Sequence, residues 1–171
     1  MEESSTVLMA MTYSEESDDF RKTLKMCEKK VLMPGALPLK KSDTHGFRST
    51  EYGPVFFGIS EAAEQETLTD AVENLILLKK NLRQTKYMIF HVSGDEQILM
   101  MQRFADAYAV LEDYVLPNTP ILIGASSDRS LGRAFHVTIM AVLYDLPRRG
   151  SGIMNCKKIL KRARQLAWAH W

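Results

Sequence analysis

The chain has 171 residues, of which 46% are hydrophobic and 25% are charged, which are the proportions of a soluble globular protein. This length fits one domain with room for an accessory helix. No apolar run approaches the roughly 20 residues of a membrane-spanning helix, and the acidic N-terminus lacks the basic start of a signal peptide. We therefore expect a cytoplasmic protein in which Cys27 and Cys156 are reduced thiols and not zinc ligands.

Charge is distributed unevenly along the chain, although the net charge is only +1. Residues 1–20 contain six acidic residues and no Lys or Arg, whereas residues 146–171 contain seven basic residues and no acidic one. The two ends are expected to attract opposite partners. The basic end suits nucleic acid, an acidic membrane surface or an acidic protein, and charge alone does not choose among the three.

The N-terminal part of the chain is predicted to contain one long helix. Residues 5–11 are apolar enough for a short strand, and an apolar stripe at helical spacing then predicts a helix over residues 14–33. Pro34 and Gly35 end this helix, because proline cannot continue it and glycine accepts the turn. Residues 36–53 show no clear period, which is typical of a connector.

From residue 54 onward the pattern alternates between strands and helices. Strands are predicted at 55–59 and 87–92, each followed by a helix with an apolar face. Residues 121–124 and 135–143 predict two more strands, and the short polar turn between them indicates an antiparallel hairpin. The expected fold class is α+β, a four-stranded mixed sheet packed by two helices, preceded by a long helix and followed by a basic C-terminal helix.

These elements divide the chain into four parts. They are an N-terminal segment with the long helix (1–35), a connector (36–53), an α+β domain (54–145) and a basic tail helix (146–171).

Several segments share their residue spacing with one known family. Ile123 to Ala141 reads Ile-Gly, three residues, Asp, two residues, Leu, and then Val-Thr-Ile and Ala. Upstream, 87–95 is an apolar strand that closes in Gly94-Asp95 and is similar to a family strand that closes in Gly-x-Asp. Residues 53–59 are a strand that begins with Gly, and 20–35 is a helix ending in Pro-Gly. In this order the segments resemble FtsZ, the tubulin homologue. The resemblance covers about residues 17–145 and implies the linking helix and C-terminal domain of FtsZ.

The resemblance does not extend to the nucleotide domain of FtsZ. That domain's glycine-rich phosphate loop would have to precede the long helix, where about 16 residues remain. Of the nine glycines only Gly150 and Gly152 lie close together, without the amide cluster that holds phosphates. We therefore expect a protein that lacks the GTPase domain, does not bind GTP unaided, needs no cofactor and is not an enzyme.

The connector begins where the resemblance places a catalytic loop. In FtsZ the loop after Pro-Gly carries Asn-x-Asp-x-x-Asp, whose carboxylates enter the GTP site of the neighbouring subunit. Here Pro38 stands for the Asn, Lys40 for the first Asp, and Asp43 for the second. Lysine cannot accept the proton of an attacking water, so hydrolysis in trans is not expected. Lys40 and Asp43 are predicted to contact a partner instead, and a plain solvated connector is the alternative.

The remaining polar residues favour structural roles. His91 and His136 are each flanked by apolar residues and are predicted to lie on a sheet face or in the core, rather than to act as a catalytic base. Asp128 is predicted to order its own turn through the backbone. The ten methionines are predicted to fill core gaps.

The tail carries a surface of its own. As a helix, residues 156–168 would place Ile159, Ala163 and Leu166 on one face and the basic residues outside it. One interpretation is an amphipathic helix that binds a partner protein, a membrane surface or nucleic acid. The other is a helix docked on its own domain, since tryptophans are costly to leave in water. The residues predicted to form the binding surface are Lys157, Lys158, Lys161, Arg162, Arg164 and Trp168.

The favoured function is a non-enzymatic FtsZ-like protein that works by protein–protein contact. Its partner would be FtsZ or a second copy of itself, which would make it a filament modulator, a filament cap or a self-assembling component in cell division. One alternative is an adaptor or structural protein unrelated to cell division. The other is a small enzyme of the chorismate-mutase kind, with sites between the subunits of a trimer, for which Arg and Glu side chains converging in a subunit cleft would be the evidence.

Overall fold

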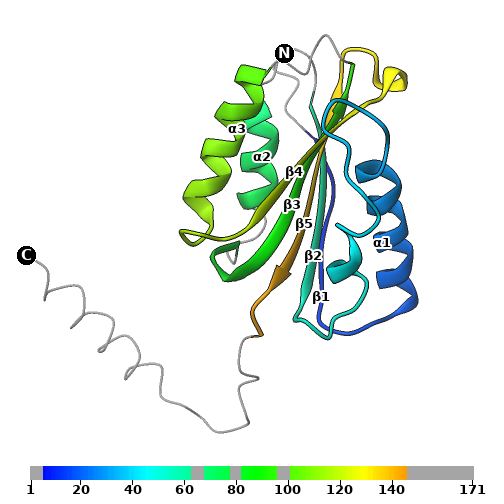
Figure 1. The fold of residues 1–171 in the computed structure, drawn as a ribbon, viewed down its shortest axis with the longest axis vertical. Coiled ribbons are helices and arrows are strands. Elements are labelled where there is room, and N and C mark those ends of the chain that lie inside the picture. The colour runs from blue at the N-terminus through cyan, green and yellow to red at the C-terminus, as the bar shows by residue number, and fades with distance from the viewer. Residues whose placement is uncertain (1–5, 63–67, 78–81, 96–100, 146–171) are drawn as a thin grey trace, which may run out of the picture.

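A computed structural model of the protein describes residues 6–62, 68–77, 82–95 and 101–145. A central sheet is covered by α2 and α3 on one face and by α1 on the other (Figure 1). None of the helices in these ranges is long and apolar enough to cross a membrane. The elements, in chain order, are β1 (Thr6–Tyr13), α1 (Asp18–Val31), β2 (Val55–Ala62), α2 (Leu68–Leu77), β3 (Thr85–Gly94), α3 (Met101–Tyr114), β4 (Ile121–Ser127) and β5 (Phe135–Leu143).

The sheet has five strands in the order β1-β2-β5-β3-β4, one more than predicted. The additional strand is β1, which pairs antiparallel with β2 and forms one edge of the sheet. The α+β class and the mixed sheet are as predicted. The apolar residues of β1 are enough to predict an extended segment, but not its partner. That partner, β2, follows only after α1 and the connector. The strand count was therefore wrong because pairing over that distance has no local signal.

The predicted hairpin of β4 and β5 is also wrong, because β3 lies between them. β4 is parallel to β3, whereas β5 is antiparallel to both β3 and β2. All nine residues of β5 are buried, so this strand suits the middle of a sheet, where both of its edges are paired. Neighbouring strands are only about 4.8 Å apart, so the short connection 128–134 is long enough to cross β3.

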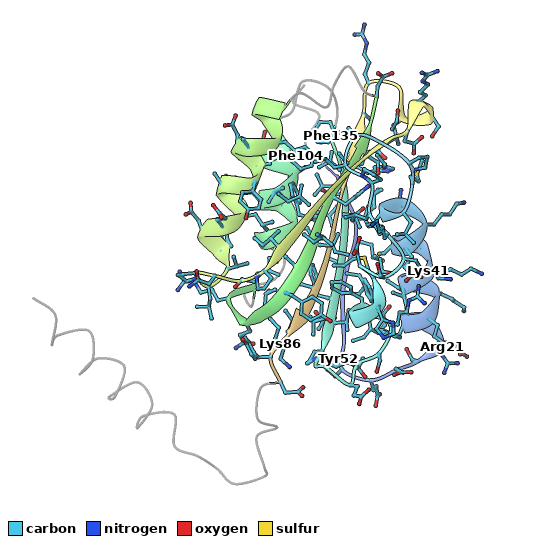
Figure 2. All side chains as sticks on the ribbon, in the orientation of Figure 1. Arg21, Lys41, Tyr52, Lys86, Phe104 and Phe135 are labelled. Atoms are coloured by element: carbon cyan, nitrogen blue, oxygen red, sulfur yellow. The ribbon has the colours of Figure 1, made fainter. Side chains whose placement is uncertain are left out.

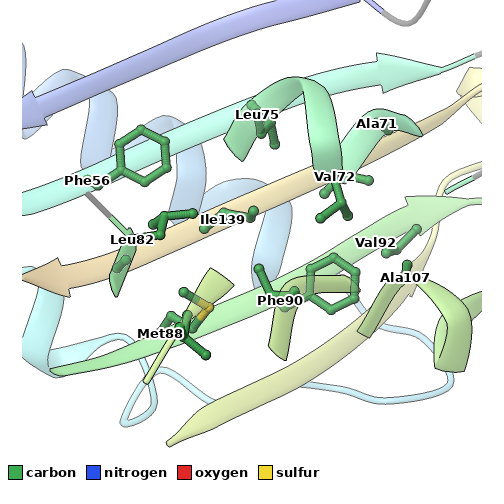
Figure 3. Close-up of a cluster of buried hydrophobic side chains, with 14 of the residues drawn as sticks. Phe56, Ala71, Val72, Leu75, Leu82, Met88, Phe90, Val92, Ala107 and Ile139 are labelled. Atoms are coloured by element: carbon green, nitrogen blue, oxygen red, sulfur yellow. The ribbon is translucent and has the colours of Figure 1, made fainter. Parts of the chain in front are cut away.

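The larger hydrophobic core lies between the sheet and the helices α2 and α3. Figure 3 shows Val72 and Leu75 of α2 above the sheet, with Phe90 and Ile139 on strands β3 and β5 beneath them. Phe90 meets Phe104 of α3 edge to face, with 5.4 Å between the ring centroids. Within the described residues, the apolar faces predicted for both helices are therefore the faces that they bury.

A second core lies between the sheet and α1. Phe20, Cys27 and Val31 are fully buried, and they pack against Phe57 and other residues on this face of the sheet. Ser17 caps the start of the helix, because its hydroxyl accepts a hydrogen bond from the backbone N–H of Phe20 at 3.1 Å. Burial raises the pKa of the Cys27 thiol to about 12, which keeps it protonated.

Candidate functional site

The loop that follows α1 is fastened to the outer edge of β4. Ser127 N–H donates to the carbonyl of Pro34 at 3.1 Å, and Leu37 and Ala125 exchange two backbone hydrogen bonds of 3.1 and 3.0 Å. Gly35 sits so close to β4 that a Cβ there would lie 2.3 Å from the Cα of Ser126. The Pro-Gly pair therefore both ends the helix and lets the loop backbone lie flat against β4.

Lys40 and Asp43 close a tight turn in this loop. The carboxylate of Asp43 accepts a hydrogen bond of 2.7 Å from the backbone N–H of Lys40, and the N–H of Asp43 donates to the Lys40 carbonyl at 2.9 Å. Lys40, Lys41 and Ser42 are exposed, and Figure 2 labels Lys41 on the α1 side of the molecule. The turn thus holds the carboxylate against its own backbone and presents its lysines to solvent.

The rest of the connector is not simply solvated, because it contributes to the second core. Thr44 and Phe47 are fully buried, and the ring of Phe47 packs edge to face on Tyr87 with 5.2 Å between centroids. Glu28 of α1 holds this part in place. Its Oε1 accepts hydrogen bonds from Thr44 Oγ1 at 2.6 Å and from Arg48 Nε at 3.0 Å, and Arg48 Nη2 lies 2.9 Å away. The loop is therefore fixed to α1 as well as to β4.

A row of polar residues crosses the sheet near the C-terminal end of α1. Glu61, His136, Ser93 and Ser126 are register partners on β2, β5, β3 and β4. Lys30 Nζ lies 2.9 Å from His136 Nδ1, and His136 Nε2 lies 2.7 Å from Glu61 Oε2. Lysine can only donate, so Nδ1 accepts and the proton on Nε2 is donated to Glu61. This chain of contacts ties α1 to β5 and β2.

His91 lies two residues before Ser93 on β3 and has no access to solvent. It is fully buried, and its Nδ1 is 3.5 Å from Ser93 Oγ, which accepts a hydrogen bond from Ser126 Oγ at 3.1 Å. Burial, reinforced by the charge of Lys30, lowers the pKa of His91 to about 4. A serine beside a histidine is the arrangement of an activated nucleophile. Ser93 is only 1% exposed, however, so no substrate can reach its hydroxyl.

The structure brings some predicted residues together and leaves others outside the described ranges. Lys40 and Asp43 meet in one turn, and Asp128 accepts hydrogen bonds from the N–H and hydroxyl of Ser130, as predicted for a residue that orders its own turn. The predicted tail residues Lys157, Lys158, Lys161, Arg162, Arg164 and Trp168 all fall outside the described ranges. Among the described residues, no group of three His, Cys, Asp or Glu side chains is placed to hold a metal ion.

Sequence reasoning missed the contacts that hold the loop and the polar row. The pair Lys30 and His136 is separated by 106 positions, and Glu61 comes from a third segment. The sequence contained a weak indication of a role for Glu28, because it is an acidic residue among the lysines of α1. Its partners on the connector could not have been named, since that segment has no periodic pattern to orient its side chains.

Comparisons with known proteins connect this geometry to one fold. No family model matches the sequence, and no curated protein is significantly similar to it. An empty FtsZ dimer from M. jannaschii does match in structure, over 71% of this chain and 36% of its own, with a TM-score of 0.57 and 22% identity. The chain has the fold of a part of FtsZ. A point mutant of M. jannaschii FtsZ matches over 64% of this chain and 33% of its own, with a TM-score of 0.53 and 22% identity.

The chain thus spans about a third of the length of the FtsZ structures that it matches. At this identity the likeness establishes the fold. It agrees with the order of segments that resembles FtsZ in the sequence.

Proposed function

We propose that this protein is a non-enzymatic FtsZ-like protein of the cytoplasm, which lacks the GTPase domain and acts through contacts with other proteins. The observation that carries the proposal is the position of the turn Lys40–Asp43 in the fold. This turn follows α1 and Pro-Gly within a fold shared with FtsZ, at the place where the sequence resemblance puts the loop that meets a neighbouring subunit. A subunit contact is therefore the use that best fits this surface.

The chemistry of the turn favours docking over hydrolysis. Lys40 is exposed and cationic where a carboxylate would be needed to accept the proton of water. The Asp43 carboxylate accepts a hydrogen bond from its own loop backbone, so leaving that turn to orient a water would cost the loop this contact. At the nucleotide site of a neighbouring subunit, the charge of Lys40 would attract the phosphates of GTP but would not activate the attacking water. Docked on a filament end, such a loop would occupy the contact and leave GTP uncleaved.

Among the described residues, the Arg–Glu pair that the structure places most closely, Arg48 with Glu28, gives the enzyme alternative no support. Arg48 and Glu28, which form a close Arg–Glu pair, bind each other within one chain and fasten the connector to α1. Their side chains are 34% and 19% exposed, so they serve packing more than an open cleft between subunits. We propose that the basic tail supplies a second contact to the same partner, which would carry an acidic surface.

The test is sedimentation of FtsZ polymers formed with GTP in the presence of the full chain. A filament cap should lower the pelleted polymer at amounts well below one chain per FtsZ. Lys40→Asp should weaken this effect, because it reverses the charge that the proposal places in the contact. Arg129→Asp is the matched control, since Arg129 is an exposed base on the turn between β4 and β5. Unchanged polymer mass at equimolar chain would contradict the proposal.

A further inference from the structure

β1 is an edge strand whose described residues offer little of the usual protection of an edge. Its sequence, TVLMAMTY, contains no charged residue, no proline and no glycine. Soluble proteins commonly blunt such edges with charges, prolines or covering loops, because open backbone groups recruit other strands. The other edge, β4, is covered along its C-terminal half by Pro34 and Leu37. Within the described ranges, β1 has β2 on one side and no strand on the other, and its one irregularity is a bulge at Leu8.

Apolar side chains lie exposed beside this edge. Leu8 is 52% exposed, Met11 46% and Met26 42%. Tyr13 joins β1 to α1, since its hydroxyl is 2.9 Å from Thr23 Oγ1 and donates to Met11 Sδ at 3.3 Å. Met26 lies one turn after Thr23, on the same side of the helix. Met11 and Met26 are therefore close together, and with Leu8 and the outer edge of β1 they are here called the β1 patch.

The charge at the β1 end of this patch is acidic, whereas Lys22 and Lys29 flank Met26 one turn away on α1. Glu15, Glu16, Asp18 and Asp19 follow β1 directly, and all four are exposed. Asp18 and Asp19 lie 3.9 and 4.0 Å from Arg21 and Lys22, but these pairs are largely solvated and therefore weak.

A second copy of β1 would bring no basic side chain to these acids, because its sequence TVLMAMTY contains none. The β1 patch therefore favours an occupant with apolar side chains and basic residues.

We propose that the occupant is the chain's own basic tail, residues 146–171. The tail has the required chemistry, with seven basic residues, no acidic one, and the apolar residues Ile159, Leu166 and Trp168. It also starts in the right place. Tyr13 at the end of β1 pairs with Val55, and Val55 pairs with Val142 near the end of β5, so both strands end at the same end of the sheet.

The distance is within reach of the tail. Two strand spacings separate β5 from β1, which is about 10 Å. The seven residues 146–152 span up to roughly 23 Å when extended. A tethered segment also has an effective concentration in the millimolar range, so contact within one chain forms ahead of contact between chains in dilute solution. The basic residues of the tail are then held against the acidic residues that follow β1. Any other molecule that binds the basic tail competes with this contact inside the chain.

The test uses the full chain with its methionine methyl groups labelled for NMR, together with hydrogen exchange of β1. Changing Lys157, Lys158, Lys161 and Arg162 to Glu should shift the methyl signals of Met11 and Met26. It should also speed exchange of the outward-facing β1 amides about tenfold or more. The signal of Met140, which is fully buried in the second core, should stay in place and report an intact fold.

Two further variants make the result decisive. Glu15→Lys with Glu16→Lys should shift the same two methyl signals from the other side of the contact. A matched control changes four exposed bases that lie outside β1 and α1 to Glu and should leave both signals in place; these bases are Lys41, Arg83, Arg129 and Arg133.

Unchanged signals of Met11 and Met26 in the tail variant would overturn the inference. So would shifts that depend on protein concentration, because they would mean that a second copy covers the patch. The experiment contains no FtsZ, so its failure leaves the proposed function untouched, and the inference stands without that function.

Discussion

Replacing Gly35 by alanine tests how the loop after α1 is seated on β4. The new Cβ would lie 2.3 Å from Ser126 Cα, 2.4 Å from the Ala125 carbonyl oxygen and 2.9 Å from Ser127 N. These are backbone atoms of a strand that also pairs with β3, so they cannot yield as a flexible side chain would. We therefore expect the loop to lift away from β4 in the Gly35→Ala protein.

The expected cost follows from the contacts that the lifted loop loses. Three backbone hydrogen bonds join 34–37 to β4, at 3.0 to 3.1 Å, and each is worth about 0.5–1.5 kcal/mol. Alanine also restricts the unfolded chain, which returns about 0.4–1 kcal/mol. The free energy of unfolding should therefore fall by about 0.5–4 kcal/mol, measured by urea titration followed by circular dichroism.

A neighbouring substitution provides the control for this experiment. Ala36 is exposed, so Ala36→Ser should change the free energy of unfolding by no more than about 0.5 kcal/mol. Hydrogen exchange of the Ala125 and Ser127 amides should accelerate in Gly35→Ala and stay slow in Ala36→Ser. Equal stability of Gly35→Ala and the parent, with both amides still protected, would refute the close seating of the loop on β4.

Three other changes probe the core, the buried histidine and the loop. Ile139→Ala should lower the free energy of unfolding by about 2–5 kcal/mol in a urea titration, because Ile139 is fully buried on the central strand β5, and a parent-like midpoint would contradict that placement. The pKa of His91 is lowered to about 4, so the unfolded chain binds a proton more readily than the folded one. The free energy of unfolding should therefore fall from pH 6.5 toward pH 4, by up to about 3 kcal/mol. A His91→Leu protein, compared over the same pH series, should lack this part of the loss. Asp43→Ala should cost about 0.5–1.5 kcal/mol through the lost hydrogen bond from Lys40, whereas Glu28→Ala should cost about 1–3 kcal/mol because it leaves Arg48 and the buried Thr44 without their shared acceptor. An unchanged stability of the Glu28→Ala protein would mean that Glu28 does not anchor the loop.

The sequence was a good guide to elements and a poor one to their pairing. Apolar residues at helical spacing located α1, α2 and α3, because each helix buries one continuous face, as Leu75 and Leu111 show. The strands β2, β3, β4 and β5 were located by short apolar runs. The place of β4 beside β3, and not beside β5, depends on a crossover whose length suits either arrangement. Chain order alone could not decide between the two.

The candidate site was predictable only where it follows one local motif. Lys40 and Asp43 were found because their spacing from Pro-Gly matches an FtsZ loop, and they do close one turn. The surface that β1 adds, with Leu8 and Met11 exposed, was not predicted, since methionines were expected to fill gaps in the core. Whether such a residue faces the core or solvent is set by the edge position of its strand, which only the assembled sheet defines.

The measurement that tests the central claim most directly is phosphate release from GTP in samples that contain FtsZ, the full chain, or both. The chain alone should release no phosphate above the buffer rate. Added to FtsZ in substoichiometric amount, it should lower phosphate release because fewer subunit contacts form. Phosphate release by the chain alone, or an unchanged rate when it is mixed with FtsZ at equimolar amount, would contradict a non-enzymatic protein that acts through contact with FtsZ.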